Sequence, residues 1–283
     1  MNILVTGGAG FVGTNLIKTL LKEGHEVTSI DNYNTGLKTN HQKGATYVEF
    51  DIRNISDYSA FGDFDIIFHM AAIARIQPSF QIPEEYFTVN ANATLKLAKY
   101  CTENNIPLIY AGSSSHHSGK FKNPYTFSKD IGEEIIVLFQ RLYGLKSSIA
   151  RFYNVYGPHQ LVDGGYTTLI GAWDKMIREG KPLIIYGDGE KRRDFTHVND
   201  IVSGLKLIME KEAWGYEFEF GRGKNYSINE ISQMFDKEVK YLENKPGEAQ
   251  NTLCEDTLAK EILGWEPIHN IEDYIENYLN NDK

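Results

Sequence analysis

Short apolar runs alternate with longer amphipathic stretches over the first half of this chain. Six runs predict buried β-strands, at residues 3–5, 26–30, 46–50, 64–68, 107–111 and 146–150. Apolar residues at helical spacing lie between them and predict helices at 11–21, 83–104 and 124–142. Strands that alternate with helices in this way favour a parallel, doubly wound α/β sheet of the Rossmann type.

The pattern changes after Arg151, where glycine, proline and aromatic residues become frequent and the predicted elements become short. They are helices at 167–178, 199–210, 228–235, 255–263 and 271–279, and a strand at 183–186. We therefore expect a dinucleotide-binding domain over residues 1–152. Residues 153–283 are expected to form mainly a smaller substrate-binding lobe, with some segments returning to the sheet.

The turn after the first predicted strand carries glycine at Gly7, Gly10 and Gly13. Glycines let the backbone approach a pyrophosphate closely, and the start of the following helix presents free N–H groups to the phosphates. Asp31 ends the second predicted strand, 18 residues after Gly13. A carboxylate at that place accepts hydrogen bonds from the adenosine ribose and repels a 2′-phosphate, so the pattern favours NAD over NADP.

Further polar or small residues follow the next predicted strands. Asp51 is placed either to accept from the adenine amino group or to cap the turn at Asn54. Ala71 and Ala72 would let the backbone lie against a flat cofactor. His69 is interpreted as a structural, hydrogen-bonded histidine rather than a base.

Tyr125 and Lys129 are four residues apart on a predicted helix and share one face. An ammonium near a phenol favours the phenolate, so we expect Lys129 to lower the pKa of Tyr125 and make it a general base. Lys129 could also reach the nicotinamide ribose. A serine hydroxyl at the neighbouring strand end could share the proton of a substrate alcohol. Together these groups would support reversible alcohol oxidation.

Composition narrows the classes of partner. The formal net charge of −9 argues against nucleic-acid binding, and no apolar run approaches the ~20 residues that span a bilayer. Two cysteines, Cys101 and Cys254, do not suggest a disulfide framework or a metal site. We therefore expect no bound metal. There is also no signal peptide pattern, so we expect a cytoplasmic protein.

In order, the motifs resemble those of the extended short-chain dehydrogenase/reductase family, in its nucleotide-sugar epimerase/dehydratase group, most of all enzymes like UDP-glucose 4-epimerase. The residues that carry the resemblance cover nearly the whole chain: Thr6 to Gly13, Asp31-Asn32, Asp51-Ile-Arg53, His69-Met-Ala-Ala72, Asn90 with Thr94, Ser113 to Ser115, Tyr125 with Lys129, Arg151 to Pro158, Arg193 to Val198 with Asp200, Pro246-Gly247 and Leu263 to Pro267.

The resemblance implies tightly bound NAD and a nucleoside-diphosphate sugar whose hexose lies over the nicotinamide. Tyr125 would take a proton from a sugar hydroxyl, usually at C4, while hydride passes to NAD and later returns to the other face. The implied cofactor-binding residues are Gly7, Gly10, Phe11, Val12, Gly13, Asp31, Asn32, Asp51, Ile52, Ala71, Ala72, Asn90 and Lys129. The implied substrate-binding residues are Ser115, His116, Asn154, Arg193 and Lys245.

The chain departs from this group in three places. The serine run continues into His116 and His117, and alignment on Gly119 gives the hydroxyl role to Ser114, ahead of Ser113 and Ser115. Dehydratases of the group carry an Asp-Glu pair after that hydroxyl, where this chain has Ser115 and His116. Tyr125 follows Ser114 by only 11 positions, which shortens a loop beside the sugar. Lys245 stands where an arginine is usual.

The first hypothesis is therefore an NAD-dependent epimerase of a nucleotide sugar, acting at C4. The alternatives are a keto-sugar reductase, a 3,5-type epimerase that uses His116 or His117, a 4,6-dehydratase, and a non-catalytic NAD-binding regulator. Two long helices in the second half of the nucleotide-binding domain suggest a homodimer.

Overall fold

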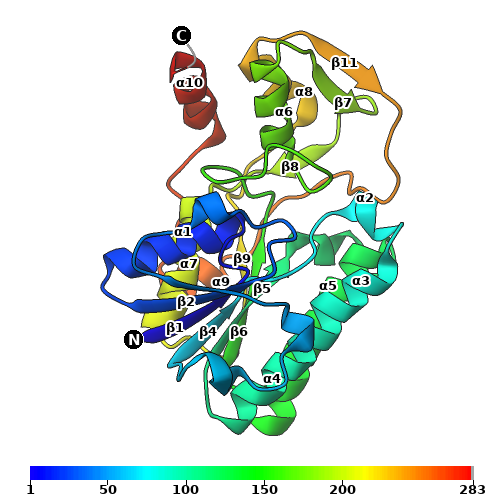
Figure 1. Cartoon of the computed structure of the whole chain (residues 1–283). Helices are drawn as coiled ribbons and strands as arrows, with labels where there is room; N and C mark the ends of the chain where they lie inside the picture. Colours follow the sequence, from blue (N-terminus) through cyan, green and yellow to red (C-terminus); the bar gives the residue numbers. More distant parts are fainter. Residues whose placement is uncertain (282–283) are drawn as a thin grey trace.

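The computed structural model describes residues 1–281, and a seven-stranded parallel sheet lies at its centre (Figure 1). The sheet has the order β3-β2-β1-β4-β5-β6-β9. Its strands are β1 (Asn2–Thr6), β2 (Glu26–Asp31), β3 (Thr46–Glu49), β4 (Ile66–His69), β5 (Leu108–Ser113), β6 (Ser147–Phe152) and β9 (Glu217–Phe220). The change of direction in strand order between β1 and β4 is typical of doubly wound folds, so the predicted fold class is confirmed.

Helices cover both faces of this sheet (Figure 1). One face carries α1 (Phe11–Lys22), α7 (Val198–Glu210) and α9 (Leu258–Leu263), and the other carries α3 (Pro83–Phe87), α4 (Thr94–Glu103) and α5 (Pro124–Tyr143). Successive residues of β1 serve the two faces, with Ile3 and Val5 in the first apolar core and Leu4 in the second. This alternation explains why the strand reads as a continuous apolar run.

The remaining elements form a lobe beyond the carboxyl ends of the strands, at the top of Figure 1. It contains α6 (Leu169–Arg178), α8 (Ile228–Phe235), α10 (Ile271–Asn281) and two small sheets, β7 (Leu183–Tyr186) with β11 (Val239–Leu242) and β8 (Arg192–Asp194) with β10 (Asn225–Ser227). Trp173, Phe235 and Tyr156 fill a third apolar core there. The short α2 (Ile76–Ser79) follows β4.

The six strands predicted in the first half are all present, whereas β8, β9, β10 and β11 were not predicted. β9 alternates glutamate with phenylalanine, and Glu219 lies buried in the sheet because Arg151 pairs with it at 2.9 Å. The helix predicted at 83–104 is helical over most of its length, but Thr88–Ala93 forms a π-helical segment within it. Such segments often occur near functional sites.

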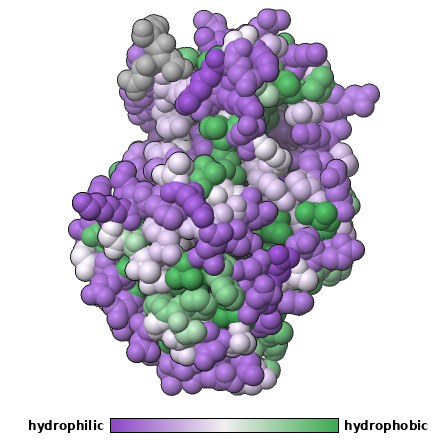
Figure 2. Space-filling view, in the orientation of Figure 1, coloured by the Kyte–Doolittle hydropathy of each residue, from purple (hydrophilic) through white to green (hydrophobic). Residues whose placement is uncertain are grey.

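The surface in Figure 2 is mostly hydrophilic, with smaller hydrophobic areas among the polar residues. Among the described residues, none of the helices combines the length and the apolar character that crossing a membrane requires.

Candidate active site

A cavity of about 710 Å³ lies between the carboxyl ends of the strands and the lobe. This volume is in the range of ligand pockets, roughly 300–1,000 Å³. Most of the predicted site residues line it: Gly7, Gly10, Phe11, Val12, Gly13, Asp31, Asn32, Asp51, Ile52, Ala71, Ala72, Ser114, Ser115, Tyr125, Asn154 and Arg193. The predicted cofactor-binding residues and the predicted catalytic and substrate-binding residues therefore surround one cavity.

The glycine turn leaves room for backbone where side chains would collide. A Cβ on Gly7, whose φ is +73°, would lie 2.8 Å from the Ala71 backbone, and one on Gly13 would lie 2.3 Å from the Gly7 carbonyl oxygen. Gly10 is the N-cap of α1 and provides no side-chain cap, which leaves the first N–H groups of the helix available to an anion. These features fit the pyrophosphate of NAD.

The two strand-end carboxylates have different surroundings. Asp31 accepts hydrogen bonds from the backbone N–H groups of Ala9 and Tyr33, at 3.0 and 2.8 Å, and burial raises its pKa. Asp51 accepts from the Arg53 guanidinium, which lowers the pKa of Asp51 to about 2. Asp51 also caps the short 3₁₀ helix Ile52–Asn54, so the capping interpretation of this residue agrees with the structure.

Tyr125, near the start of α5, lies beside the serine run at the end of β5. Its hydroxyl donates to Ser113 Oγ at 3.1 Å, and Ser113 Oγ donates to Ser115 Oγ at 2.9 Å. The hydroxyl that contacts Tyr125 is thus that of Ser113, which the sequence ranked below Ser114. The difference arises because β5 continues through Ser113, whose side chain then caps the 3₁₀ helix Ser114–Ser118.

Lys129 does not contact the Tyr125 hydroxyl. Its ammonium donates to the Tyr110 hydroxyl at 2.8 Å and to the Ala111 carbonyl at 2.6 Å, and burial lowers the pKa of Lys129 to about 8. The pKa of Tyr125 is raised by burial, an effect that the Ser113 hydrogen bond opposes. The expectation that Lys129 lowers the Tyr125 pKa is therefore wrong for this arrangement. Lys129 instead ties α5 to β5.

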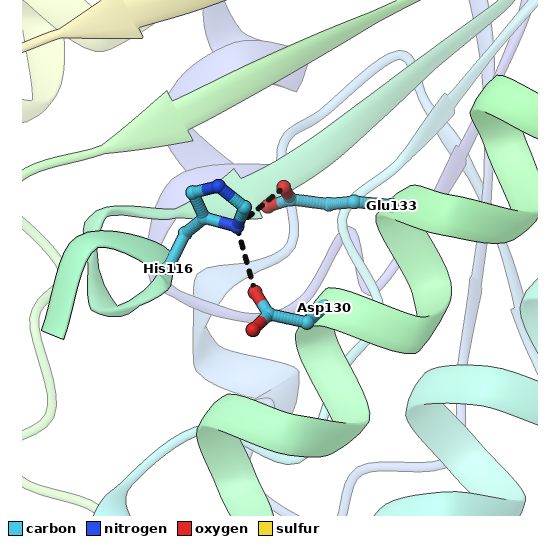
Figure 3. Close-up of side chains that lie close together, drawn as sticks. All are labelled: His116, Asp130 and Glu133. Carbon is cyan, nitrogen blue, oxygen red and sulfur yellow. Dashed lines mark hydrogen bonds and ion pairs between the residues drawn. The ribbon is translucent and has the colours of Figure 1, made fainter. Parts of the chain in front are cut away.

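His116 was expected to bind substrate but is not among the residues that line the cavity, and its ring points toward Asp130 and Glu133 of α5 (Figure 3). Its Nδ1 lies 2.9 Å from Asp130 Oδ1 and 3.7 Å from Glu133 Oε2. One possible ligand atom from each of these three residues lies within 4.8 Å of the other two, a spacing that could hold a metal ion. However, the same Glu133 oxygen accepts from Arg151 Nε at 2.8 Å, so the geometry describes an ion-pair network with an arginine inside it.

Like Lys129 and His116, two further predicted residues lie outside the cavity lining. Lys245 was expected to bind the diphosphate, but its ammonium lies 3.5 Å from the ring centroid of Tyr186. Asn90 was expected to touch the cofactor, but it is buried and exchanges hydrogen bonds with the backbone of Ile73 at 2.9 and 3.0 Å. Asn90 thus fixes the loop after β4, which does line the cavity.

On the lobe side, Asn154 donates to the Asp194 carbonyl and to Thr252 Oγ1, both at 3.0 Å. Arg193 Nη2 lies 3.5 Å from Glu248 Oε2. Sequence reasoning missed Glu248, Thr252 and Arg75 as lining residues. Arg75 could have been noticed as a basic residue three positions after Ala72.

His69 is also placed as expected. It is buried between the hydroxyls of Thr6 and Thr94, at 2.7 and 3.1 Å, and burial lowers its pKa to about 3. A histidine in that state is neutral and structural, so its interpretation is confirmed.

Comparisons with known proteins agree with this geometry. The model of the NAD dependent epimerase/dehydratase family matches residues 3–221. A putative UDP-glucose 4-epimerase of Methanocaldococcus jannaschii is 31% identical over 300 aligned residues, covering 98% of this chain and 97% of that protein. The structure of the Thermotoga maritima UDP-glucose 4-epimerase with UDP-glucose has a TM-score of 0.92 at 28% identity, with both chains covered fully.

A second solved structure is the UDP-glucuronic acid 4-epimerase of Bacillus cereus with UDP-glucuronic acid and NAD, which has a TM-score of 0.88 at 28% identity and also covers both chains fully. The expectations of an NAD cofactor and of an enzyme of the nucleotide-sugar epimerase group are confirmed. The chain belongs to the NAD-dependent epimerase/dehydratase family.

Proposed function

We propose that this protein interconverts the C4 epimers of a UDP-sugar, with Tyr125 as the acid–base group. The observation that carries the proposal is the hydrogen-bonded series Tyr125–Ser113–Ser115, which opens on the same cavity as the glycine turn. A base and a cofactor cradle that share one cavity are what a reversible sugar oxidation requires.

The reaction would proceed by removal and return of two hydrogens. Burial raises the pKa of Tyr125, and the positive charge of a bound oxidised nicotinamide would favour its phenolate. As the phenolate, Tyr125 would accept the proton of the C4 hydroxyl while the C4 hydrogen leaves with its electron pair, so that the C4–O bond becomes a carbonyl. NAD held at the glycine turn and by Asp31 would take up that hydride and return it. After the keto sugar turns in the cavity, Tyr125 returns the proton to the carbonyl oxygen, which gives the inverted alcohol.

The lobe would hold the nucleotide part of the substrate. Arg193 lines the cavity, and its planar guanidinium suits a diphosphate. Asn154 shares that wall, and its amide is fixed by Asp194 and Thr252. Lys245 is not part of this proposal, because its ammonium is occupied with Tyr186.

Proton NMR of the purified protein with single UDP-sugars tests the function. UDP-glucose, UDP-glucuronate and UDP-N-acetylglucosamine would each be added without external cofactor, and we expect the C4 epimer of at least one to accumulate to equilibrium. A product that has lost water would replace the proposal with dehydration. Absence of a C4 epimer with all three sugars, despite bound NAD, would refute it.

We also propose a homodimer that forms through α4 and α5, which pack against each other. Leu95, Leu138 and Leu142 on these helices are 44%, 47% and 67% exposed, and a second copy would cover them. Light scattering of the wild type is expected to give a molar mass of twice the chain mass. Leu138→Arg should lower the measured mass to that of a single chain. A wild-type monomer would contradict the proposal.

A cytoplasmic location is likewise proposed, and the free buried thiols of Cys101 and Cys254 are compatible with it.

A further inference from the structure

Three arginines line the cavity, and they differ in their partners. Arg53 pairs with Asp51 at 2.8 Å and also with Glu85, and Arg193 lies 3.5 Å from Glu248. Arg75 forms no ion pair with a carboxylate of residues 1–281. It is therefore the lining arginine without a direct ion-pair partner in the described part of the protein, although the charge of Glu248 acts on it at longer range.

Arg75 is nevertheless held in a defined position. Its Nε donates to the Tyr166 carbonyl at 3.0 Å, and its own carbonyl accepts from the Tyr86 hydroxyl at 2.9 Å. Within the described residues, its two terminal nitrogens have no hydrogen-bond partner. The backbone φ of +106° is unusual for a residue with a side chain, and strain of this kind persists where the surroundings impose it. The two terminal nitrogens of the Arg75 guanidinium are thus available to a ligand.

Partial burial makes that unpaired charge unfavourable without an anion. Burial lowers the pKa of Arg75, and the groups that oppose this effect are led by Tyr125 and followed by Glu248. An anionic group that entered the cavity would offset the desolvation of the guanidinium.

The position of Arg75 indicates which end of the substrate carries that anion. The Tyr86 ring, whose hydroxyl holds the Arg75 backbone, packs edge-on against the Tyr125 ring with 6.2 Å between centroids. The Arg75 backbone therefore lies on the Tyr125 side of the cavity, and Tyr125 acts on the Arg75 charge more strongly than Glu248 does, whereas Arg193 comes from β8 of the lobe. In a hexopyranose, C4 lies between C3 and C5, and in hexuronates C5 carries a carboxylate.

We propose that Arg75 binds a carboxylate on C5 of the sugar, so that the preferred substrate is a UDP-hexuronate. This inference rests on the proposed epimerase function for its assignment of C4 to Tyr125. It identifies the substrate class by charge. A bidentate guanidinium–carboxylate pair would also fix the ring relative to Tyr125.

Isothermal titration calorimetry of the NAD-loaded protein tests the proposal with UDP, UDP-glucose and UDP-glucuronate. We expect the wild type to bind UDP-glucuronate at least tenfold more tightly than UDP-glucose. In Arg75→Gln, the affinity for UDP-glucuronate should fall by about 10- to 100-fold, the range of a charged hydrogen-bonded pair, while UDP and UDP-glucose change less than threefold. Arg75→Lys should fall between the wild type and Arg75→Gln, because lysine retains charge but not the fork.

Arg178→Gln is the matched control, since Arg178 is an exposed arginine paired with Asp174 outside the cavity. It should bind all three ligands as the wild type does, and melting temperatures would verify that each variant folds. Equal losses for UDP, UDP-glucose and UDP-glucuronate in Arg75→Gln would assign Arg75 to the diphosphate and overturn the proposal. A wild type without preference for UDP-glucuronate would also overturn it. Because binding is measured without turnover, these outcomes are separate from failure of the NMR test of epimerisation.

Discussion

Tyr125→Phe is expected to lower kcat for C4 epimerisation by about 10²- to 10⁴-fold, the usual contribution of a positioned acid–base group. The substitution keeps the ring, which packs against Tyr86, and removes the hydroxyl that donates to Ser113. Affinity for the UDP-sugar should stay within about threefold, because the hydroxyl acts on a proton in the transition state rather than on binding. The measurement is the initial rate of epimer formation by NMR.

Tyr143→Phe provides the control, since Tyr143 ends the same helix and is 60% exposed. Its rate should equal that of the wild type. Ser113→Ala and Ser114→Ala in the same assay separate the two serines, and the larger loss is expected for Ser113, which contacts Tyr125. A loss of less than tenfold in Tyr125→Phe would remove Tyr125 from the acid–base role.

Arg151→Met is expected to lower the free energy of unfolding by about 3–5 kcal/mol, the range found when one partner of a buried ion pair is removed. Arg151 is 6% exposed, and its guanidinium lies within 2.8 Å of Glu133, 2.9 Å of Glu219 and 2.5 Å of Glu217. Burial lowers the pKa of Arg151, but Glu133 and Glu219 raise it above its ordinary value. Methionine would leave Glu133 and Glu219 buried without a guanidinium. Urea unfolding at pH 7 gives the difference.

The deficit of Arg151→Met should depend on pH in one direction. Without the guanidinium, burial raises the folded-state pKa of the buried carboxyls above the unfolded value. The folded variant then binds more protons than the unfolded chain, so its stability falls as pH rises. The gap to the wild type should therefore narrow between pH 7 and pH 5. Arg178→Met, which breaks an exposed pair, should change stability by about 0–1 kcal/mol. A loss below 1 kcal/mol at Arg151, or one that is independent of pH, would contradict the expectation.

Local patterns predicted the parts of this protein that depend on neighbouring residues. The glycine turn, the acid at Asp31 and the position of Tyr125 follow from spacing along a strand or helix, and each lies at the cavity. The fold class followed from the alternation of strands and helices. These patterns do not decide whether Ser113 or Ser114 contacts Tyr125. Neighbouring residues of a strand point to opposite faces, so the answer depends on the residue at which the strand ends.

The remaining errors come from contacts between distant segments. Lys129 was expected beside the Tyr125 hydroxyl, but its ammonium donates instead to the Tyr110 hydroxyl and the Ala111 carbonyl of β5. His116 was expected in the cavity, but Asp130 lies one residue after Lys129 and draws the imidazole to α5. β9 was missed because its buried glutamate, Glu219, is compensated by a residue far away in the sequence, Arg151 of β6.

The place of β9 in the sheet has a consequence for how the protein emerges from the ribosome. The apolar core on the α1 side joins residues of β1 and α1 to Phe218 of β9, Ile201 of α7 and Leu263 of α9. A nascent chain halted at residue 152 would carry the whole glycine turn and the Tyr125 helix, yet on this side of its sheet only α1 would be present, and the area that α7 and α9 cover would remain open to water. Stable NAD binding should therefore begin only late in translation, after residue 263 has been made. Until then the apolar face of the unfinished sheet is a natural target for chaperones.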